Sequence, residues 1–353
     1  MNAPDPTAAS ATLPAAPPPP GEEFRDQAPA RQARRLPAAE LAPLTTLAPW
    51  KSIASLAWSY GGLALAIGLA LAFWTPWVVV PCVAVIACFQ HSLAILSHEA
   101  THYRLFESRF ANDLAGRVSG MLVGVSTFSY RIVHRLHHNH LYQAADPDIA
   151  LMAGYPRGKA YLARKLLKDL AGLTAPLNYA YFFGAPGANR ATGVAQRPLD
   201  DTAERLRNQA LRDRWVVVAF HVLALGAAIA TGWWLQYLVL WVLPLVTLMQ
   251  AVLRLRAVME HGAVSDLSSP LTAARTNVEV PWWGRFIFFP HHVNFHIDHH
   301  LYPAVPHYHL PRLHEALKRH GILEGAEVRP FRDTLRRVFG PRGSVPIVRT
   351  AEA

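Results

Sequence analysis

The chain has 353 residues, of which 52% are hydrophobic and only 16% are charged, and its formal net charge is +10. This composition is more apolar and less charged than that of an ordinary soluble domain, so it favours a membrane protein. The basic residues alternate with long charge-free runs, which argues against a nucleic-acid-binding domain and favours contact with an anionic membrane surface.

The first part of the chain predicts a tail followed by two membrane spans. Residues 1–38 are rich in Ala and Pro and hold little that a core could bury, so we expect a disordered tail. From Ser52 to His98 no Asp, Glu, Lys or Arg occurs, and this run is about twice the ~20 residues that one transmembrane helix needs. We therefore expect spans at about residues 52–73 and 77–97.

A second charge-free run, residues 215–253, predicts another pair of spans at about residues 215–232 and 235–254. The turn inside each pair lacks Lys and Arg and is rich in aromatic residues, whereas the three remaining segments are strongly basic. By the positive-inside rule the basic segments and both termini face the cytoplasm. The fold class predicted is an all-α membrane protein with four transmembrane helices in two hairpins.

The polar segments predict a helical cap on the cytoplasmic side. Residues 98–214 are too many for a bare loop, and their apolar centre is too short for a span, so an interfacial or partly buried helix fits better. Near the end, "PRLHEALKRHG" has the pattern of an amphipathic helix. We expect an integral-membrane domain over residues 39–330 and a basic C-terminal tail over residues 331–353.

Three groups of histidines carry the chemistry. They are His98 and His102 in "HEATH", His134, His137 and His138 in "HRLHH", and His296, His299 and His300 in "HIDHH". On a helix these spacings place imidazoles about 5–6 Å apart at Cβ, close enough to hold a common metal. Because all three groups follow the cytoplasmic ends of predicted spans, we expect them to converge on a metal site.

The string "HEATH" also fits the zinc-protease pattern H-E-x-x-H, in which Glu99 would be the general base. A zinc hydrolase needs about three protein ligands, and eight clustered imidazoles exceed that number. An intramembrane zinc metalloprotease therefore stays a remote alternative, and Glu99 is expected to orient an imidazole instead. Imidazole-rich sites with two metals suit iron that activates O2.

These motifs resemble the three histidine boxes of the membrane fatty acid desaturase and hydroxylase superfamily, and the resemblance runs from about residue 50 to 320. Within it, the rhizobitoxine-type desaturases are the subgroup that the chain resembles. The resemblance implies four transmembrane helices under a cytosolic cap that holds two iron ions. The implied ligands are the eight box histidines, His98, His102, His134, His137, His138, His296, His299 and His300, together with His261 in "MEHG".

Six further residues beside the boxes are candidates to support the ligand rings by hydrogen bonds. They are Glu99, His91, His140, Asp146, Asp148 and Asn294. For the two aspartates the competing interpretation is a turn set by Pro147, and for His91 it is a plain buried histidine. His291, His292, His307 and His309 match no box, and the motifs assign them no role.

The resulting hypothesis is O2-dependent oxidation of an unactivated C–H bond in a lipid acyl chain, most simply the introduction of a double bond. A lipid hydroxylase or carotenoid ketolase-like oxygenase is the alternative, because these reactions share the same ligands. Two cysteines cannot build an iron–sulfur centre, and the cytochrome b5 string "HPGG" is absent. We therefore expect a separate electron donor of ferredoxin, rubredoxin or cytochrome b5 type, and a location in a bacterial inner membrane.

Overall fold

The computed structural model describes residues 35–345 except 144–145, 149–151, 153, 186, 189–194, 197–198, 200–201 and 265. Most of the predicted N-terminal tail, residues 1–34, and the last residues of the predicted basic tail, 346–353, therefore lie outside the described residues. The described chain is mostly helical, with two small two-stranded pairings. This confirms the predicted all-α class.

Four helices are long and apolar enough to cross a membrane, as the charge-free runs predict. They are α3 (Pro49–Ala72), α4 (Pro76–Thr101), α10 (Glu204–Ala230) and the nearly continuous stretch Trp234–His261, which is formed by α11 (Trp234–Tyr237), η1 (Leu238–Val242), α12 (Leu243–Val246) and α13 (Leu248–His261). Most are longer than the predicted spans, because helical hydrogen bonding continues past the first charged residue. The C-terminal extensions of α4 and α13 bring histidines out of the apolar region.

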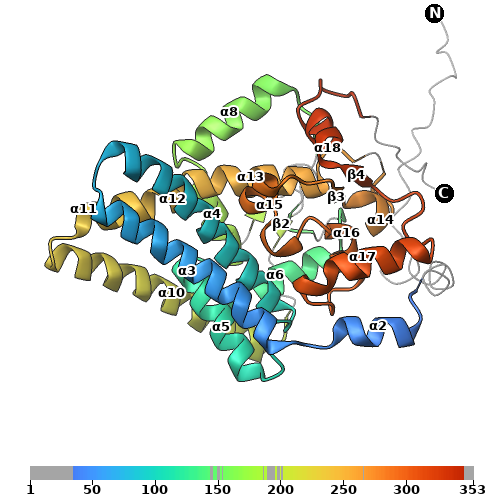
Figure 1. Ribbon diagram of the computed structural model, residues 1–353, viewed down its shortest axis with the longest axis horizontal. Helices are drawn as coiled ribbons and strands as arrows, with labels where there is room; N and C mark the ends of the chain where they lie inside the picture. The colour runs from blue at the N-terminus through green and yellow to red at the C-terminus, as the bar shows by residue number, and fades with distance from the viewer. Residues whose placement is uncertain are drawn as a thin grey trace, which may run out of the picture.

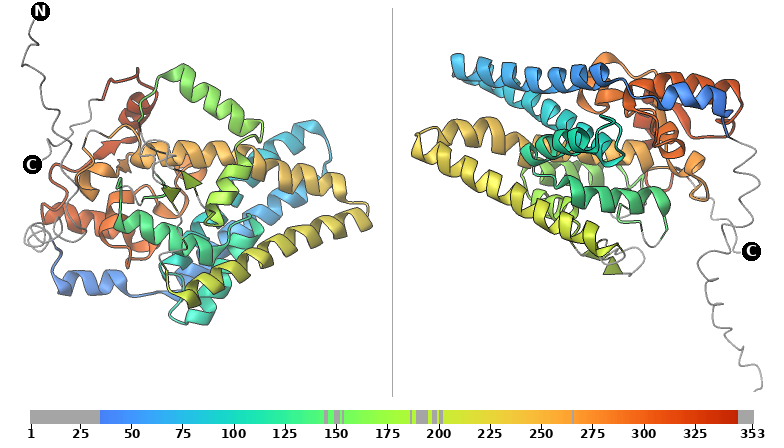
Figure 2. Two further views of the ribbon diagram at one scale, coloured as in Figure 1. Left: turned by 180° about the vertical axis from the view of Figure 1, so that it is seen from behind. Right: turned by 90° about the horizontal axis from the view of Figure 1, so that it is seen from below.

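The four long helices lie at one end of the molecule and the shorter elements at the other (Figure 1). Figure 2 shows α3 and α10 on the outer sides, with α4 and α13 between them. The inner helices are also the more buried ones: 61% of the most apolar 18-residue stretch of α4 is buried, but only 17% of the corresponding stretch of α10. Ile86, Leu93 and Leu96 of α4 lie at the centre of the largest apolar core. Helix α4 is therefore the axis on which the other elements pack.

The region predicted as one interfacial helix forms two, α5 (Arg109–Leu122) and α6 (Thr127–Asn139). Each begins at a serine, Ser108 or Ser126, whose hydroxyl accepts a hydrogen bond from a backbone N–H of the first turn. A turn through Gly124, with φ +73°, separates them. Because α5 and α6 both contact α4, the second histidine box lies against the first.

The polar end is assembled from short elements of the last third of the chain. Its amphipathic helix, predicted from "PRLHEALKRHG", is α17 (Leu310–Arg319), which buries Leu313 and Leu317 against Leu44 of α2. The other helices and strands are α2 (Ala38–Thr45), α8 (Lys159–Leu170), α9 (Ala175–Phe182), α14 (Pro270–Ala273), α15 (Trp282–Ile287), η2 (Pro290–His292), α16 (His296–Leu301), η3 (His307–His309), α18 (Phe331–Val338), β1 (Gly187–Ala188), β2 (Ala195–Gln196), β3 (Thr276–Val278) and β4 (Val328–Pro330).

Two features join this end together. Strand β3 pairs in parallel with β4, with Thr276 opposite Val328. Within the predicted basic tail, α18 buries Phe331 and Val338 in the same apolar cluster as Met259 of α13. The segment between α13 and α18 is thereby held against the ends of the long helices, where α16 carries the third histidine box.

Candidate metal centre

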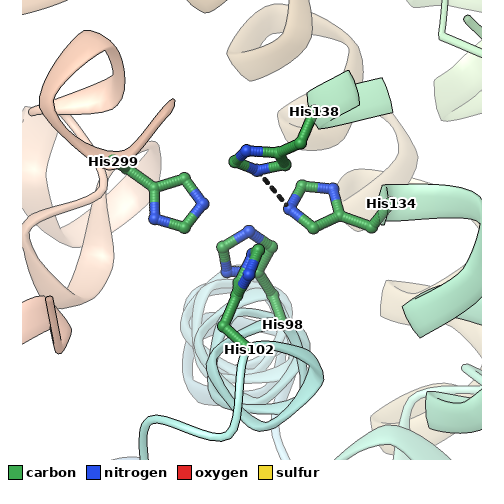
Figure 3. Close-up of side chains that lie close together, drawn as sticks. All are labelled: His98, His102, His134, His138 and His299. Atoms are coloured by element: carbon green, nitrogen blue, oxygen red, sulfur yellow. Dashed lines mark hydrogen bonds between the residues drawn. The ribbon is translucent and has the colours of Figure 1, made fainter. Parts of the chain in front are cut away.

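Five imidazoles form the first histidine cluster: His98 of α4 and His102 just after its last residue, His134 and His138 of α6, and His299 of α16. Each ring offers a nitrogen, and these nitrogens all lie within 4.8 Å of one another. Figure 3 shows the five rings turned toward one common space. All three boxes therefore contribute to a single cluster.

Four further imidazoles form the second histidine cluster: His137 of α6, His261 at the end of α13, and His296 and His300 of α16. Their ligand nitrogens also lie within 4.8 Å of one another. The ring centroids of His138 and His300, one from each cluster, are 4.2 Å apart. Two adjacent sites thus bring together all nine histidines expected as ligands, including His261.

The second and third boxes are divided between the clusters, although their spacing suggested that each would serve one common metal. With 3.6 residues per turn, His134 and His138 stand about 40° apart around α6, whereas His137 is rotated by about 100° from His138. Consequently His134 and His138 enter the first cluster and His137 enters the second. His299 is separated from its box neighbours in the same way.

The second cluster presents ring nitrogens that converge in a way that fits a cation between them. His137 and His261 face each other through Nε2 at 3.2 Å, and His261 and His296 do so at 2.7 Å. Meanwhile His137 Nδ1 donates to Asp146 Oδ1 at 3.0 Å, and His261 Nδ1 donates to the Ala273 carbonyl at 3.2 Å. A neutral imidazole with its proton on Nδ1 has a lone pair on Nε2, so converging lone pairs fit metal ligation.

The first cluster fits a metal for a related reason. Buried ring nitrogens of His98, His102, His134 and His299 have no hydrogen-bond partner within the described residues. Such orphaned groups are rare in folded proteins and call for an ion or water. Burial lowers the pKa of His102 to about 3, and it lowers the pKa of His134 and His299 well below the usual value. These rings are therefore neutral at physiological pH, as metal ligation requires.

His137 differs from the other clustered histidines because two carboxylates adjoin its ring. Its Nδ1 lies 3.0 Å from Asp146 and 3.4 Å from Asp148. Burial acts to lower the pKa of His137, but the two negative charges outweigh it and raise the pKa to about 9. The carboxylates also hold the Nδ1 proton and orient the ring. Asp146 and Asp148 therefore contact the ring of His137. This matches the expectation that they support a box histidine, for which a turn at Pro147 was the competing interpretation.

Glu99 lies between two imidazoles. One oxygen is 3.3 Å from His98 Nδ1, and the other accepts from the His307 backbone N–H at 3.0 Å and lies 3.3 Å from His307 Nδ1. Both oxygens are thus engaged, so this geometry matches the expected orienting role and leaves no oxygen facing a metal-bound water. His307 was not assigned by the motifs, and its contact with Glu99 spans 208 positions of sequence.

Three other expected supporting residues do not touch a ligand ring through a described hydrogen bond. His91 Nδ1 donates to the Ile287 carbonyl at 3.1 Å, and His140 pairs with Gln143 at 3.0 Å. Asn294 Nδ2 donates to the Asn277 carbonyl at 2.9 Å. These residues hold neighbouring backbone in place instead.

Some supporting contacts were missed by the sequence reasoning. Asp298, inside the third box, accepts from His314 Nδ1 at 2.9 Å and from the Thr276 hydroxyl at 2.8 Å, which fixes α16. Glu260 lies 3.9 Å from His296 Nδ1 and accepts from Arg256 at 2.8 Å. The position of Asp298 between ligand histidines, and of Glu260 beside His261, was a signal that could have identified both.

A cavity of about 300 Å³ adjoins the first cluster. His102, His134 and His138 form part of its wall, and apolar side chains such as Phe128 and Leu206 form much of the rest. The pocket's apolar lining and its contact with three candidate ligands are what a site for an apolar substrate requires.

Comparison with known proteins identifies the family. The profile named fatty acid desaturase matches residues 72–330. Relatives include the oleoyl-12-hydroxylase of Ricinus communis, 24% identical over 254 residues, which are 65% of this chain and 63% of that protein. The chloroplastic omega-3 fatty acid desaturase of Glycine max is 24% identical over 247 residues, 64% of this chain and 51% of that protein.

The dihydrorhizobitoxine desaturase of Bradyrhizobium elkanii is also similar, at 23% identity over 250 residues, 69% of this chain and 67% of that protein. The matched region thus spans between about half and two thirds of these three relatives. The family profile, by contrast, covers more than half of this chain and includes all nine clustered histidines. The protein therefore belongs to the fatty acid desaturase family.

Proposed function

We propose that this protein catalyses the O2-dependent oxidation of an unactivated C–H bond in a lipid acyl chain and that the product carries a new double bond. The observation that carries this proposal is the pair of adjacent clusters made from nine buried or partly buried histidines. Their occurrence in a fatty acid desaturase family member with four apolar helices supports it further. An apolar substrate could enter such a protein directly from the bilayer.

The proposed cofactor is a pair of iron ions, with O2 as cosubstrate. The proposed ligands are His98, His102, His134, His138 and His299 for one ion and His137, His261, His296 and His300 for the other. When bound, the irons would supply the oxidising power that removes hydrogen from an unactivated carbon. Burial keeps rings such as His102, His134 and His299 neutral, while Glu99 and Asp146 orient His98 and His137.

The cavity beside the first cluster is the proposed place of the substrate. Phe128, Ile132 and Leu206 would hold an acyl chain and exclude water, while His134 and His138 mark the side on which oxidation occurs. Arg135, which also lines this cavity, is exposed and would meet a polar head group near the mouth. The protein thereby contributes position rather than a separate acid or base.

Hydroxylation is the second candidate, since one relative is named a hydroxylase. Desaturation removes two hydrogens from the substrate, whereas hydroxylation adds one oxygen, so mass spectrometry of the product separates them. The zinc protease alternative is disfavoured by the contacts of Glu99 with His98 and His307.

The membrane arrangement is part of the same proposal. We place the two pairs of long helices as hairpins in a bacterial inner membrane, with the metal-binding cap and both termini in the cytoplasm. The desaturase domain would comprise residues 39–330, and α18 of the following segment packs against it through Phe331 and Val338. A separate donor must supply electrons, and ferredoxin-, rubredoxin- and cytochrome b5-type proteins are the candidates named from the sequence.

The test is to express the protein in cells fed labelled fatty acids, and to measure both the products and the metal content of the purified chain. We expect a product lighter by two hydrogens and about two irons per chain. His137→Ala should abolish product formation and lower the iron content. The control is His320→Ala, which alters a histidine paired with Glu40 outside the clusters and should change neither quantity. Full activity and full iron content in His137→Ala would overturn the proposal.

A further inference from the structure

A second cavity, of about 240 Å³, lies between α3, α4 and the segment from α15 to η2. Its walls are aromatic and are formed by Trp58, Phe89, Phe286 and Phe289. None of the nine clustered histidines described above lines it. The acyl substrate must reach the metal centre to be oxidised there. This cavity does not reach the clustered histidines, so it suits a ligand other than the substrate.

The floor of this cavity is polar and buried. His291 Nε2 lies 2.7 Å from the Ser92 hydroxyl and 3.2 Å from the Ser59 hydroxyl, and the two hydroxyls are 2.8 Å apart. Ser59 and Ser92 are 0% and 2% exposed. Burial holds the pKa of His291 well below its usual value, so the ring is neutral, and a ligand hydroxyl would bind by exchanging with one of the hydrogen bonds between Nε2 and the serines. Aromatic walls over such a floor match a flat ring that carries a hydroxyl group.

The backbone at this floor is strained. His291 and His292 are consecutive and have φ values of 56° and 60°, in the left-handed region that residues with a Cβ seldom occupy. Such strain persists only where the surrounding structure holds it, and it is concentrated at functional sites. Here it turns the His291 ring onto the two serines.

The cavity borders a helix that is long and apolar enough to cross a membrane. Trp58, in its wall, is 62% exposed and belongs to α3, a candidate membrane helix. Trp282 at the start of α15 is 80% exposed, and exposed tryptophans are typical of the membrane–water interface. A ligand dissolved in the bilayer could therefore enter without crossing water.

A ring contact and two polar contacts connect the floor to the first histidine cluster. The His291 ring centroid lies 5.2 Å from that of His307, and His307 contacts Glu99 at 3.0 and 3.3 Å. The other oxygen of Glu99 lies 3.3 Å from His98. The cavity is thus separate from the metal centre but joined to it through two side chains.

We propose that a membrane quinol binds in this cavity, with its hydroxyl on Ser92 and His291, and supplies the two electrons that the oxidation consumes. The inference rests on the proposed function. The balance closes without a further reactant: the substrate –CH2–CH2– loses two hydrogens, the quinol loses two hydrogens and becomes a quinone, and O2 takes all four to form two waters. A quinol supplies electrons and protons together, which a buried metal centre needs.

The test uses the iron-loaded full chain in lipid nanodiscs and decylubiquinone as the probe. Wild-type protein should bind decylubiquinone and should oxidise decylubiquinol over many turnovers in step with product formation. Ser92→Ala and His291→Asn should each weaken decylubiquinone binding about tenfold or more. Asn tolerates the left-handed backbone of residue 291, so the second variant removes the imidazole without adding strain.

Ser97→Ala is the matched control, because Ser97 is a buried serine of the same helix whose hydroxyl lies 2.8 Å from that of Thr127 and outside the cavity. Its decylubiquinone affinity should equal that of wild type. Iron content and unfolding midpoint show whether each variant is folded. If the two cavity variants do not fold, the wild-type measurements still test the proposal, because wild type must bind decylubiquinone and must oxidise decylubiquinol in step with product formation.

A single turnover separates this inference from the proposed function. Wild-type protein is reduced with dithionite, freed of excess reductant, and mixed with acyl substrate and O2. If product forms but decylubiquinol neither binds nor sustains turnover, or only a reduced ferredoxin sustains it, the quinol proposal is overturned and the oxidation stands. If no product forms in the single turnover, the proposed function itself fails, whatever the result of quinone binding.

Discussion

At the scale of single residues, carboxylates distinguish otherwise similar histidines. Asp146 accepts from His137 Nδ1 at 3.0 Å, is fully buried, and belongs to a segment nine positions after that histidine. It holds the ring with Nε2 turned toward His261, which is 3.2 Å away. The metal affinity of the second cluster therefore depends on a residue that need not touch the ion.

Asp146→Asn should lower metal affinity by about 10- to 100-fold, because the amide is a weaker acceptor and leaves the ring less firmly oriented. Competition with a chelator, followed by iron analysis, measures the loss. Asp333→Asn, which changes an exposed partner of Arg336, is the control and should retain wild-type iron. Equal iron retention in the two variants would show that Asp146 has no part in ligand orientation.

Sequence reasoning identified the ligand candidates but not how they are shared. The spacing of His134, His137 and His138 predicted that their rings lie together. Of these three, only His134 and His138 belong to one cluster of nitrogens within 4.8 Å of one another. The assignment of His137 to the other cluster follows from where α13 and α16 lie around α6. Likewise, the pairing of Glu99 with His307 depends on tertiary packing across most of the chain.

At the scale of elements, close helix contact positions the boxes. A Cβ on Gly116 of α5 would lie 2.3 Å from the Ala100 Cβ of α4 and 3.2 Å from the Thr127 side chain of α6. Only glycine permits this close approach of α5 to α4, beside the first residue of α6. The long helices were predictable from apolar runs, whereas this contact was not visible in hydropathy.

Gly116→Ala should therefore destabilise the protein by about 1–3 kcal/mol, the usual cost of overpacking a close contact. Thermal unfolding in detergent provides the measurement. Gly61→Ala is the matched control on α3, since no atom lies within 4 Å of its added Cβ. The idea fails if the two variants unfold at the same temperature.

A second element-scale device joins the strands β3 and β4. Glu327, just before β4, lies 3.4 Å from Arg275 Nε, 2.5 Å from Arg329 Nε and 3.4 Å from Arg337 Nη1. Burial acts to raise the pKa of Glu327, but the arginines outweigh it and lower the pKa below 4.5. A carboxylate whose folded pKa is lowered stabilises the fold above its unfolded pKa.

This contribution should be fully present above about pH 4.5 and be lost as the pH falls through the lower folded pKa. Glu327→Gln should cost roughly 1–3 kcal/mol at pH 7, since it removes charge-assisted hydrogen bonds, and much less in strong acid. Unfolding measured from pH 7 down to pH 3 tests both expectations. A Glu327→Gln deficit that does not shrink on acidification would assign its effect to shape rather than charge.

At the scale of the whole molecule, metal binding and folding stability should be coupled. Nine imidazoles from the region of α4, α6, α13 and α16 converge in two clusters. Their ring nitrogens point toward one another, an arrangement that a bound cation would stabilise. Any ion that binds the folded chain stabilises it by mass action. The polar end, which has few long helices, should depend on this the most.

Removal of iron by a chelator should therefore lower the unfolding midpoint, and restoration of Fe(II) should recover it. Hydrogen exchange would locate the loosened region, which we expect at α6 and α16 rather than α3. The control is His320→Ala, whose response to chelation should match that of wild type. An unchanged midpoint after complete metal removal would show that the cap is prefolded.

One turn of helix α6 contributes to both clusters: His134 and His138 belong to the first, and His137 belongs to the second. An ion captured on either side fixes that turn and so arranges the remaining donors for its neighbour. Half-loaded chains should consequently be scarce during titration with Fe(II), and occupancy should pass from none to two almost cooperatively. A foreign ion bound first in one cluster should, by the same argument, raise the affinity of the neighbouring cluster for Fe(II).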